Sequence, residues 1–276
     1  MLRLAVRVRR EQAEIVLAEL LSLAPSGVEE VAIGSGSEAV VEYAVYGAPG
    51  ELPALPDLTA ACGEALVEVR TSEVADDWDR RWRSFHRPLV LDSRLVVRPP
   101  WEEAIEAEVE IVIDPGQAFG TGAHATTRLC LEMMLSLSPG GGFLDLGCGS
   151  GVLAIAAARL GWDPVLALDY DPASVEAAVD NALVNGVAVS VSRHDLRSDP
   201  VVTAPVVAAN LLRPLLLAWC DRLAGVSPTS LPEVVIASGL LVGEADEVAG
   251  AFGRLGLAES ERRESGEWAA LLLQRG

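Results

Sequence analysis

The sequence has no lysine, since all of its 21 basic residues are arginine, and it has only four cysteines and three histidines. The cysteines stand far apart without a CxxC pair and the histidines do not cluster with them, which argues against a disulfide framework and against a metal site. No stretch of about 18 consecutive apolar residues could form a membrane-spanning helix, and the N-terminus lacks the apolar run of a signal peptide. We therefore expect a cytoplasmic protein without membrane contact.

Positive charge is also scarce, because 40 acidic residues give a formal net charge of −19 and a pI near 4.5. A surface of this sign repels phosphate backbones, so direct nucleic-acid binding is not expected. It suits a cationic partner, or it is simply a well-solvated surface, and charge alone does not decide between them. Half of the 276 residues are apolar, enough for one large domain or a medium domain with a small one.

Residues 1–70 predict a small α+β domain in the order strand, helix, strand, strand, helix, strand. Leu4, Val6 and Val8 alternate with arginines, which is typical of a half-buried strand. Helices are expected over 11–23 and 58–66, and further strands over 28–33, 39–46 and 67–70. This order indicates a ferredoxin-like module with helices on one face of an antiparallel sheet.

Residues 71–105 are expected to form a linker. Trp78, Trp82 and Phe85 have the spacing i, i+4 and i+7 that places three side chains on one face of a helix. Packing of this helix against a domain is the favoured interpretation, and direct contact with a substrate is the alternative.

Residues 106–276 alternate apolar strands with helical segments, which predicts parallel β/α units in a doubly wound, Rossmann-like sheet. The expected strands are 143–145, 165–169, 206–209 and 234–238, helices follow near residues 151, 172, 215 and 243, and 257–261 and 268–273 form a closing hairpin. Ligands bind such sheets at the carboxyl ends of the strands.

The strongest motif is the segment from Asp145 to Gly151, which follows an apolar strand and precedes a helix. Gly147, Gly149 and Gly151 have the spacing GxGxG rather than the GxGxxG of dinucleotide enzymes. Glycines let a ligand approach the backbone at a helix start, and Asp145 suits a cationic amino-acid moiety better than a pyrophosphate. A purely structural tight turn is the alternative.

Two further strands end in polar side chains. Asp169 follows the glycine loop by about 20 residues, where a carboxylate accepts hydrogen bonds from ribose hydroxyls. Capping of the next helix is the alternative, but Asp171, just before Pro172, fits the cap better. Asn210 ends the strand 206–209 and could orient an attacking amine, or it could be an ordinary turn residue.

A second glycine-rich loop runs from Asp114 to Arg128 into a helix expected over 129–137. Such a loop can close over a ligand, and Thr126 or Thr127 at the helix start can donate a hydrogen bond to it. A surface loop with a capped helix is the alternative. We interpret His124 as a structural hydrogen-bonding residue rather than a base.

Together these segments resemble the PrmA family of methyltransferases, which modify the eleventh protein of the large ribosomal subunit. The specific part is Ala118-Phe119-Gly120-Thr121-Gly122, followed by His124 and Thr126-Thr127, and the resemblance extends over essentially the whole chain. It implies a class I, S-adenosylmethionine-dependent enzyme that methylates α-amino and lysine ε-amino groups of that ribosomal protein. It also implies that the N-terminal domain, residues 1–70, binds the substrate protein. We expect a monomer.

Carried over by residue, the resemblance places Thr127, Gly147, Asp169 and Asn210 in contact with the cofactor and Phe119 near its methyl group. Asn210 and Phe119 are the expected catalytic residues. Ala125 departs from the proline common in the family, and the N-terminal module matches in layout more than in residues. Three alternatives remain: a methyltransferase acting on another protein or a small amine, a nicotinamide dehydrogenase, and a binding module without catalysis.

Overall fold

The computed structural model describes residues 2–13, 16, 29–31, 40–47, 62–73, 87–114 and 124–276. The chain divides into two compact units, Met1–Ser84 and Phe85–Gly276. The second unit thus begins inside the segment expected to be a linker. The predicted linker helix with Trp78, Trp82 and Phe85 lies outside the described residues.

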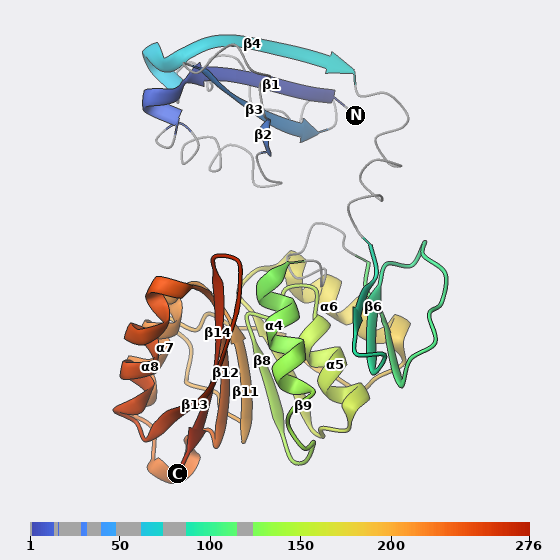
Figure 1. Cartoon of the computed structure of the whole chain (residues 1–276), viewed down its shortest axis with the longest axis vertical. Coiled ribbons are helices and arrows are strands. Elements are labelled where there is room, and N and C mark those ends of the chain that lie inside the picture. Colours follow the sequence, from blue (N-terminus) through green and yellow to red (C-terminus); the bar gives the residue numbers. More distant parts are fainter. Residues whose placement is uncertain are drawn as a thin grey trace. The chain divides into compact units, whose positions relative to one another are not determined.

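The first unit contains a four-stranded antiparallel sheet in the order β2-β3-β1-β4 (Figure 1). The strands are β1 (Leu2–Arg9), β2 (Glu29–Val31), β3 (Val40–Gly47) and β4 (Leu66–Glu73). This order and direction confirm the ferredoxin-like layout. The expected helix over 11–23 falls mostly outside the described residues, and the one over 58–66 falls partly outside them. The described parts show the 3-10 turns η1 (Arg10–Gln12) and η2 (Gly63–Ala65) with helical residues at Ala13, Val16 and Cys62, and Leu66 begins β4 instead of ending a helix.

The alternation expected in β1 sorts its side chains to two faces of this sheet. Leu4, Val6 and Val8 are buried in a core with Tyr43 of β3. On the other face Arg3 and Arg7 both bind the Glu42 carboxylate at 2.6 Å. These guanidinium groups hold the pKa of Glu42 below its usual value.

The second unit begins with a small sheet of β5 (Leu89–Leu91), β6 (Leu95–Arg98) and β7 (Val109–Val112), in the order β5-β6-β7. Leu95 and Ile111 are fully buried in the same core as Ile155 and Ala182 of two helices of the large layer. The small sheet is therefore packed onto the following domain. Sequence reasoning missed these strands because their apolar runs are only three or four residues long.

The main sheet has seven strands in the order β10-β9-β8-β11-β12-β14-β13. They are β8 (Phe143–Leu146), β9 (Val165–Asp169), β10 (Ser190–Arg193), β11 (Val206–Asn210), β12 (Val234–Leu241), β13 (Leu257–Ser265) and β14 (Trp268–Arg275). Neighbours are parallel from β10 to β12, and the β13–β14 hairpin adds antiparallel strands at one edge. The doubly wound sheet and the closing hairpin are confirmed.

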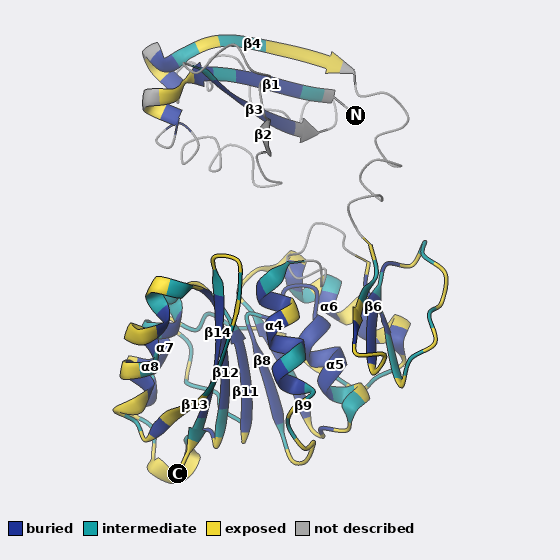
Figure 2. Cartoon of the chain, in the orientation of Figure 1, coloured by how far each residue is buried: buried dark blue, intermediate teal, exposed yellow. Residues whose placement is uncertain are grey.

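Helices cover both faces of this sheet (Figure 1). One face packs against α4 (Ala125–Met134), α5 (Val152–Leu160) and α6 (Pro172–Asn185), and the other against α7 (Arg213–Leu223) and α8 (Ala245–Gly253). The central strands are buried almost throughout (Figure 2). Within the described part of the chain, no helix is long and apolar enough to cross a membrane.

Candidate active site

The glycine loop between β8 and α5 has a backbone that only glycine accepts without strain. Gly147 and Gly151 have φ angles of +78° and +81°. A Cβ atom on Gly147 would lie 2.4 Å from Cδ2 of Leu211, and one on Gly151 would lie 3.0 Å from Cβ of Ala178. The loop thus sits close to neighbouring chain segments on both sides, and its own backbone forms part of a cavity wall.

Asp169 stands at the carboxyl end of β9 and is fixed by two backbone donors. Its Oδ2 accepts a hydrogen bond from Gly149 N at 2.8 Å, and its Oδ1 accepts one from Asp171 N at 2.9 Å. Asp171 itself caps α6 by accepting from Ala173 N at 3.1 Å, which confirms the cap assignment made from the sequence. Each oxygen of Asp169 keeps a further lone pair for a ligand hydroxyl.

A cavity of about 380 Å³ opens beside these residues. Its walls come from the ends of β8, β9, β10 and β11 and from the start of α7. The lining residues are Leu146, Gly147, Gly149, Leu168, Asp169, Tyr170, Ser174, His194, Asp195, Leu196, Arg197, Asn210, Leu211 and Leu215. The structure therefore brings the predicted Gly147, Gly149, Asp169 and Asn210 into one site at the carboxyl ends of the parallel strands.

One wall of this cavity was missed by sequence reasoning. Tyr170 is 53% exposed, and Arg193 and Arg197 lie 5.2 and 5.6 Å from its ring centroid. Arg222 of α7 donates to the carbonyl oxygens of Leu196 and Asp199 and so holds the loop after β10. Strand β10 is short and mostly exposed, so it carries no apolar signal from which this wall could have been found.

Asn210 ends β11 and borders a second cavity of about 370 Å³. The lining residues are His124, Thr126, Asn210, Leu211, Leu212, Leu215, Gly239 and Trp268. The Asn210 Nδ2 atom lies 3.4 Å from Thr127 Oγ1 and donates to it. Asn210, Leu211 and Leu215 thus line both cavities, and Asn210 is the polar side chain that they share. We call the cavity beside Gly147 and Asp169 the glycine-loop cavity, and the cavity lined by Trp268 the Trp268 cavity.

His124 is built into the start of α4. It is the N-cap residue, its Nδ1 lies 2.8 Å from Thr126 Oγ1, and its ring meets Trp268 edge-on at a centroid distance of 4.9 Å. Burial lowers the pKa of His124. The imidazole is therefore neutral at neutral pH and serves as a cap and a wall, in agreement with the structural role expected for it.

Asp145 is 1% exposed and lies beneath the glycine loop. Its Oδ2 accepts from Ala154 N in α5 at 3.0 Å, while its Oδ1 has no hydrogen-bond partner. Burial, together with the charge of Asp169, raises the pKa of Asp145 to about 7. The described lining of the glycine-loop cavity does not include this side chain. Asp145 thus connects the end of β8 to the start of α5, beneath the loop, through its bond with Ala154.

The other predicted residues divide into two groups. Thr127 is 1% exposed at the start of α4 and touches the site through Asn210. Phe119 lies outside the described residues, as does most of the second glycine-rich loop. Among the described residues, no group of three or more His, Cys, Asp or Glu side chains could hold a metal ion.

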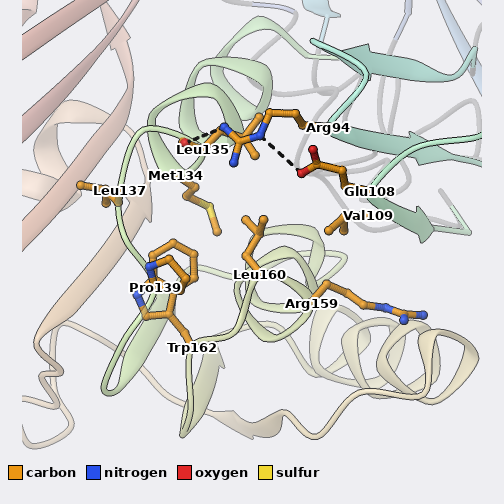
Figure 3. A pocket seen from close by; sticks show the side chains of 10 residues that line it. All are labelled: Arg94, Glu108, Val109, Met134, Leu135, Leu137, Pro139, Arg159, Leu160 and Trp162. Atoms are coloured by element: carbon orange, nitrogen blue, oxygen red, sulfur yellow. Dashed lines mark hydrogen bonds and ion pairs between the residues drawn. The ribbon is translucent and has the colours of Figure 1, made fainter.

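A third cavity, of about 230 Å³, lies near the amino ends of strands β8 and β9 (Figure 3). Pro139 and Trp162 in its wall precede β8 and β9, whereas the glycine loop follows β8. Arg94 reaches across it from the small sheet, donating to Leu135 O at 3.1 Å and pairing with Glu108 at 3.6 Å. This cavity marks where the small sheet is fastened to α4 and is separate from the site.

Comparison with known proteins agrees with this architecture. A family model described as Ribosomal protein L11 methyltransferase (PrmA) matches residues 54–276. A protein of that name from Pelotomaculum thermopropionicum is 42% identical over 213 residues, which cover 75% of this chain and 68% of that protein. Another from Heliobacterium modesticaldum is 39% identical over 206 residues, 72% of this chain and 64% of that protein.

Among solved structures, a ribosomal protein L11 methylase from Lactobacillus delbrueckii subsp. bulgaricus superimposes with a TM-score of 0.61 at 30% identity. The match covers 69% of this chain and 99% of that one. The second unit has the Rossmann-like fold of class I methyltransferases, which the alternation of strands and helices and the family resemblance led us to expect. The chain belongs to the ribosomal protein L11 methyltransferase (PrmA) family.

Proposed function

We propose that this protein transfers methyl groups from S-adenosylmethionine to α-amino and lysine ε-amino nitrogens of the eleventh protein of the large ribosomal subunit. The observation that carries the proposal is the position of Asn210 on the border between two cavities. A methyl transfer needs a donor and an acceptor on opposite sides of one carbon atom. Two adjoining cavities with a shared polar side chain meet that requirement.

The residues of the glycine-loop cavity fit S-adenosylmethionine. The missing Cβ at Gly147 leaves room beside Leu211 in the cavity wall, and Asp169 offers fixed carboxylate oxygens to ribose hydroxyls. The half-exposed ring of Tyr170 provides a flat apolar surface for a base. The carboxyl group of Asp145 lies behind the loop, and because its pKa is about 7 it is partly ionised at neutral pH, so a cationic ligand would favour its charged form. When bound, this cofactor supplies an electrophilic methyl group on a positively charged sulfur.

The Trp268 cavity suits the acceptor amine. Leu211, Leu212, Leu215 and Trp268 make most of its wall apolar. A free lysine amine has a pKa of about 10.4, roughly three units above neutral pH, and an apolar surrounding favours its reactive neutral form. The neutral His124 in the wall adds no competing positive charge.

Asn210 is the residue proposed to orient the amine. Because its Nδ2 donates to Thr127 Oγ1, its Oδ1 remains an acceptor for an amine N–H. That bond would direct the nitrogen lone pair toward the methyl carbon. The reaction neutralises the sulfur, so orientation and exclusion of water are the main catalytic tasks of the chain. Phe119 is proposed to approach the methyl group from the loop that precedes α4.

Several finer statements complete the proposal. The N-terminal unit recognises the ribosomal protein, the enzyme works as a monomer in the cytoplasm, and it makes no direct contact with nucleic acid. The net charge of −19 supports the expected partners, because an acidic surface attracts a basic ribosomal protein and repels RNA.

The test is methyl transfer from isotopically labelled S-adenosylmethionine to ribosomal proteins purified without prior methylation, resolved by mass spectrometry. Label on the eleventh large-subunit protein is the expected result. Label on another protein would support the methyl-transfer reaction and contradict the proposed acceptor protein. Cofactor binding without transfer to any ribosomal protein would favour a module without catalysis. Protection against thermal unfolding by NAD and not by S-adenosylmethionine would favour a dehydrogenase.

A further inference from the structure

Two large apolar side chains are exposed beside the Trp268 cavity. Leu212 is 64% exposed and belongs to the cavity wall. Leu241 is 43% exposed at the end of β12, where its register partner is Trp268, another wall residue. We name Leu212 and Leu241 the leucine rim. A single exposed leucine is common on protein surfaces, but here Leu212 lines a functional opening and Leu241 pairs with Trp268, another residue of its wall.

The leucine rim is held in place by an ion-pair network. Arg213, the residue after Leu212, donates to Glu244 Oε1 at 3.2 Å, and Glu244 Oε2 accepts from Leu241 N at 3.0 Å. Arg213 also binds Glu247 at 2.6 Å. One guanidinium thus connects the chain segments that carry the two leucines. A pre-organised apolar surface binds a partner with less loss of conformational entropy than a mobile one.

Acidic side chains surround the rim in excess. Glu244, Asp246 and Glu247 lie in or just before the first turn of α8. Arg213 pairs with Glu244 and Glu247, and Arg262 pairs with Asp246. Glu267 is exposed, and its carbonyl accepts from Val242 N next to Leu241 at 2.9 Å. The surroundings therefore carry net negative charge, which favours a basic segment over an acidic one.

We propose that the leucine rim docks the segment of the acceptor protein that carries the target lysine, and that it prefers a lysine with an apolar side chain beside it. This inference rests on the proposed function. Entry of the lysine into the Trp268 cavity brings its neighbours against Leu212 and Leu241, because both leucines adjoin that opening. The leucine rim favours acceptor segments with an apolar residue beside the lysine, and the surrounding acidic side chains favour segments that carry positive charge.

A matched control is available on α6, which contributes no residue to the wall of the Trp268 cavity. Leu183 of α6 is 72% exposed, and α6 packs on the face opposite α7 and α8. It has the same side chain and a similar exposure but no proximity to the Trp268 cavity. Truncation there reports the general effect of removing a surface leucine.

The experiment compares Leu212→Ala, Leu241→Ala and Leu183→Ala in the full chain. The acceptors are the intact ribosomal protein and short basic peptides with one lysine flanked by leucine or by serine. We expect each rim variant to raise KM for the leucine-flanked peptide about fivefold, with a smaller change in kcat. We expect Leu183→Ala to behave as wild type, and Leu212→Met to restore KM because methionine keeps the apolar volume.

Two results would overturn the inference, and they are distinguishable. Equal KM values of wild type for the two peptides, or an unchanged KM in both rim variants, would reject the leucine rim while leaving the methyltransferase intact. Wild-type enzyme that binds S-adenosylmethionine but methylates neither the ribosomal protein nor the peptides would reject the proposed function, and the leucine rim with it.

Discussion

The side-chain amide of Asn181 in α6 donates from Nδ2 to the carbonyl oxygen of Ser150 in the glycine loop at 2.9 Å. The same amide accepts from Asp114 N at 3.0 Å through Oδ1. Asn181 is 3% exposed, so both bonds form away from solvent. One buried side chain therefore connects the glycine loop to Asp114, just after β7, at which the second glycine-rich loop begins.

Replacement of Asn181 by Asp should weaken cofactor binding as well as stability. The new carboxylate keeps an acceptor for Asp114 N but presents oxygen to the oxygen of Ser150, and a lost buried hydrogen bond costs about 1–3 kcal/mol. Urea unfolding and calorimetric titration with S-adenosylmethionine measure the two effects. Asn185→Asp is the matched control, because Asn185 binds Val112 N and O but not the glycine loop. A similar loss of cofactor affinity in both variants would contradict the coupling.

Replacement of Gly147 by Ala should abolish most cofactor binding. The left-handed backbone costs a residue with Cβ about 1–2 kcal/mol, and the Cβ would lie 2.4 Å from Leu211 Cδ2. Since Leu211 lines both cavities, its displacement also disturbs the acceptor side. A loop that relaxes to relieve this strain must regain its conformation when the cofactor binds, so we expect about a tenfold rise in Kd, at a factor of ten per 1.4 kcal/mol. Unchanged affinity would show that the loop does not touch the cofactor.

Gly140→Ala serves as the control for this change. A Cβ there meets nothing within 4 Å, and its φ angle is not positive. It should change the free energy of unfolding by no more than about 0.5 kcal/mol and leave binding intact. The double variant Gly147→Ala with Leu211→Ala should recover the part of the stability lost to contact, and not the part lost to backbone strain.

Asp145 should make the folded protein less stable as pH rises toward neutrality. Its pKa in the folded chain is about 7, against an ordinary value of 3.8. The folded state therefore holds a proton that the unfolded state releases, and the stabilising contribution is complete below pH 3.8 and lost as pH rises through about 7. Asp145→Asn should flatten the pH dependence of unfolding between these values. A variant with the wild-type slope would show that another group controls it.

The opposite sign is expected at Glu110, which provides an internal comparison. Its hydrogen bond with Arg98 at 2.8 Å lowers the pKa of Glu110. That contribution is present above the ordinary pKa of 4.5 and is lost as pH falls. Glu110→Gln should therefore remove stability near neutral pH and little at acidic pH. Equal destabilisation at both pH values would indicate a packing effect.

What could be predicted from the sequence follows from signals local to one segment. The GxGxG spacing marks a backbone path with positive φ angles, and Asp169 and Asn210 are recognisable because apolar strands end at them. The Trp268 cavity could not be predicted, since His124 and Trp268 lie far apart in the sequence. They meet only because α4, which His124 caps, packs against β14, which Trp268 begins. The wall at Tyr170 and Arg193 depends on a strand too short and too exposed to show periodicity.

Asn210 is proposed to orient the attacking amine, and its replacement tests that role. If it orients the amine, Asn210→Ala should lower kcat about a hundred- to a thousandfold, the range of losses seen when one oriented polar group is removed from an active site. Cofactor affinity should fall much less, because Gly149 and Asp169 hold the other side of the glycine-loop cavity. Single-turnover transfer and calorimetric titration separate the two effects.

Thr127→Val tests how Asn210 is positioned. Valine keeps the volume of threonine but removes the Oγ1 acceptor, 3.4 Å from Nδ2, that fixes the direction of the amide. The amide can then rotate and present Nδ2 instead of Oδ1 to the amine, so kcat should fall by a smaller factor than in Asn210→Ala while Kd for the cofactor changes little. The double variant should be no slower than Asn210→Ala alone, because both changes remove the same bond. Additive losses in the double variant would show that the two residues act independently, so that Thr127 does not position Asn210. Equal losses of kcat and cofactor affinity in Asn210→Ala would argue against orientation of the amine by Asn210.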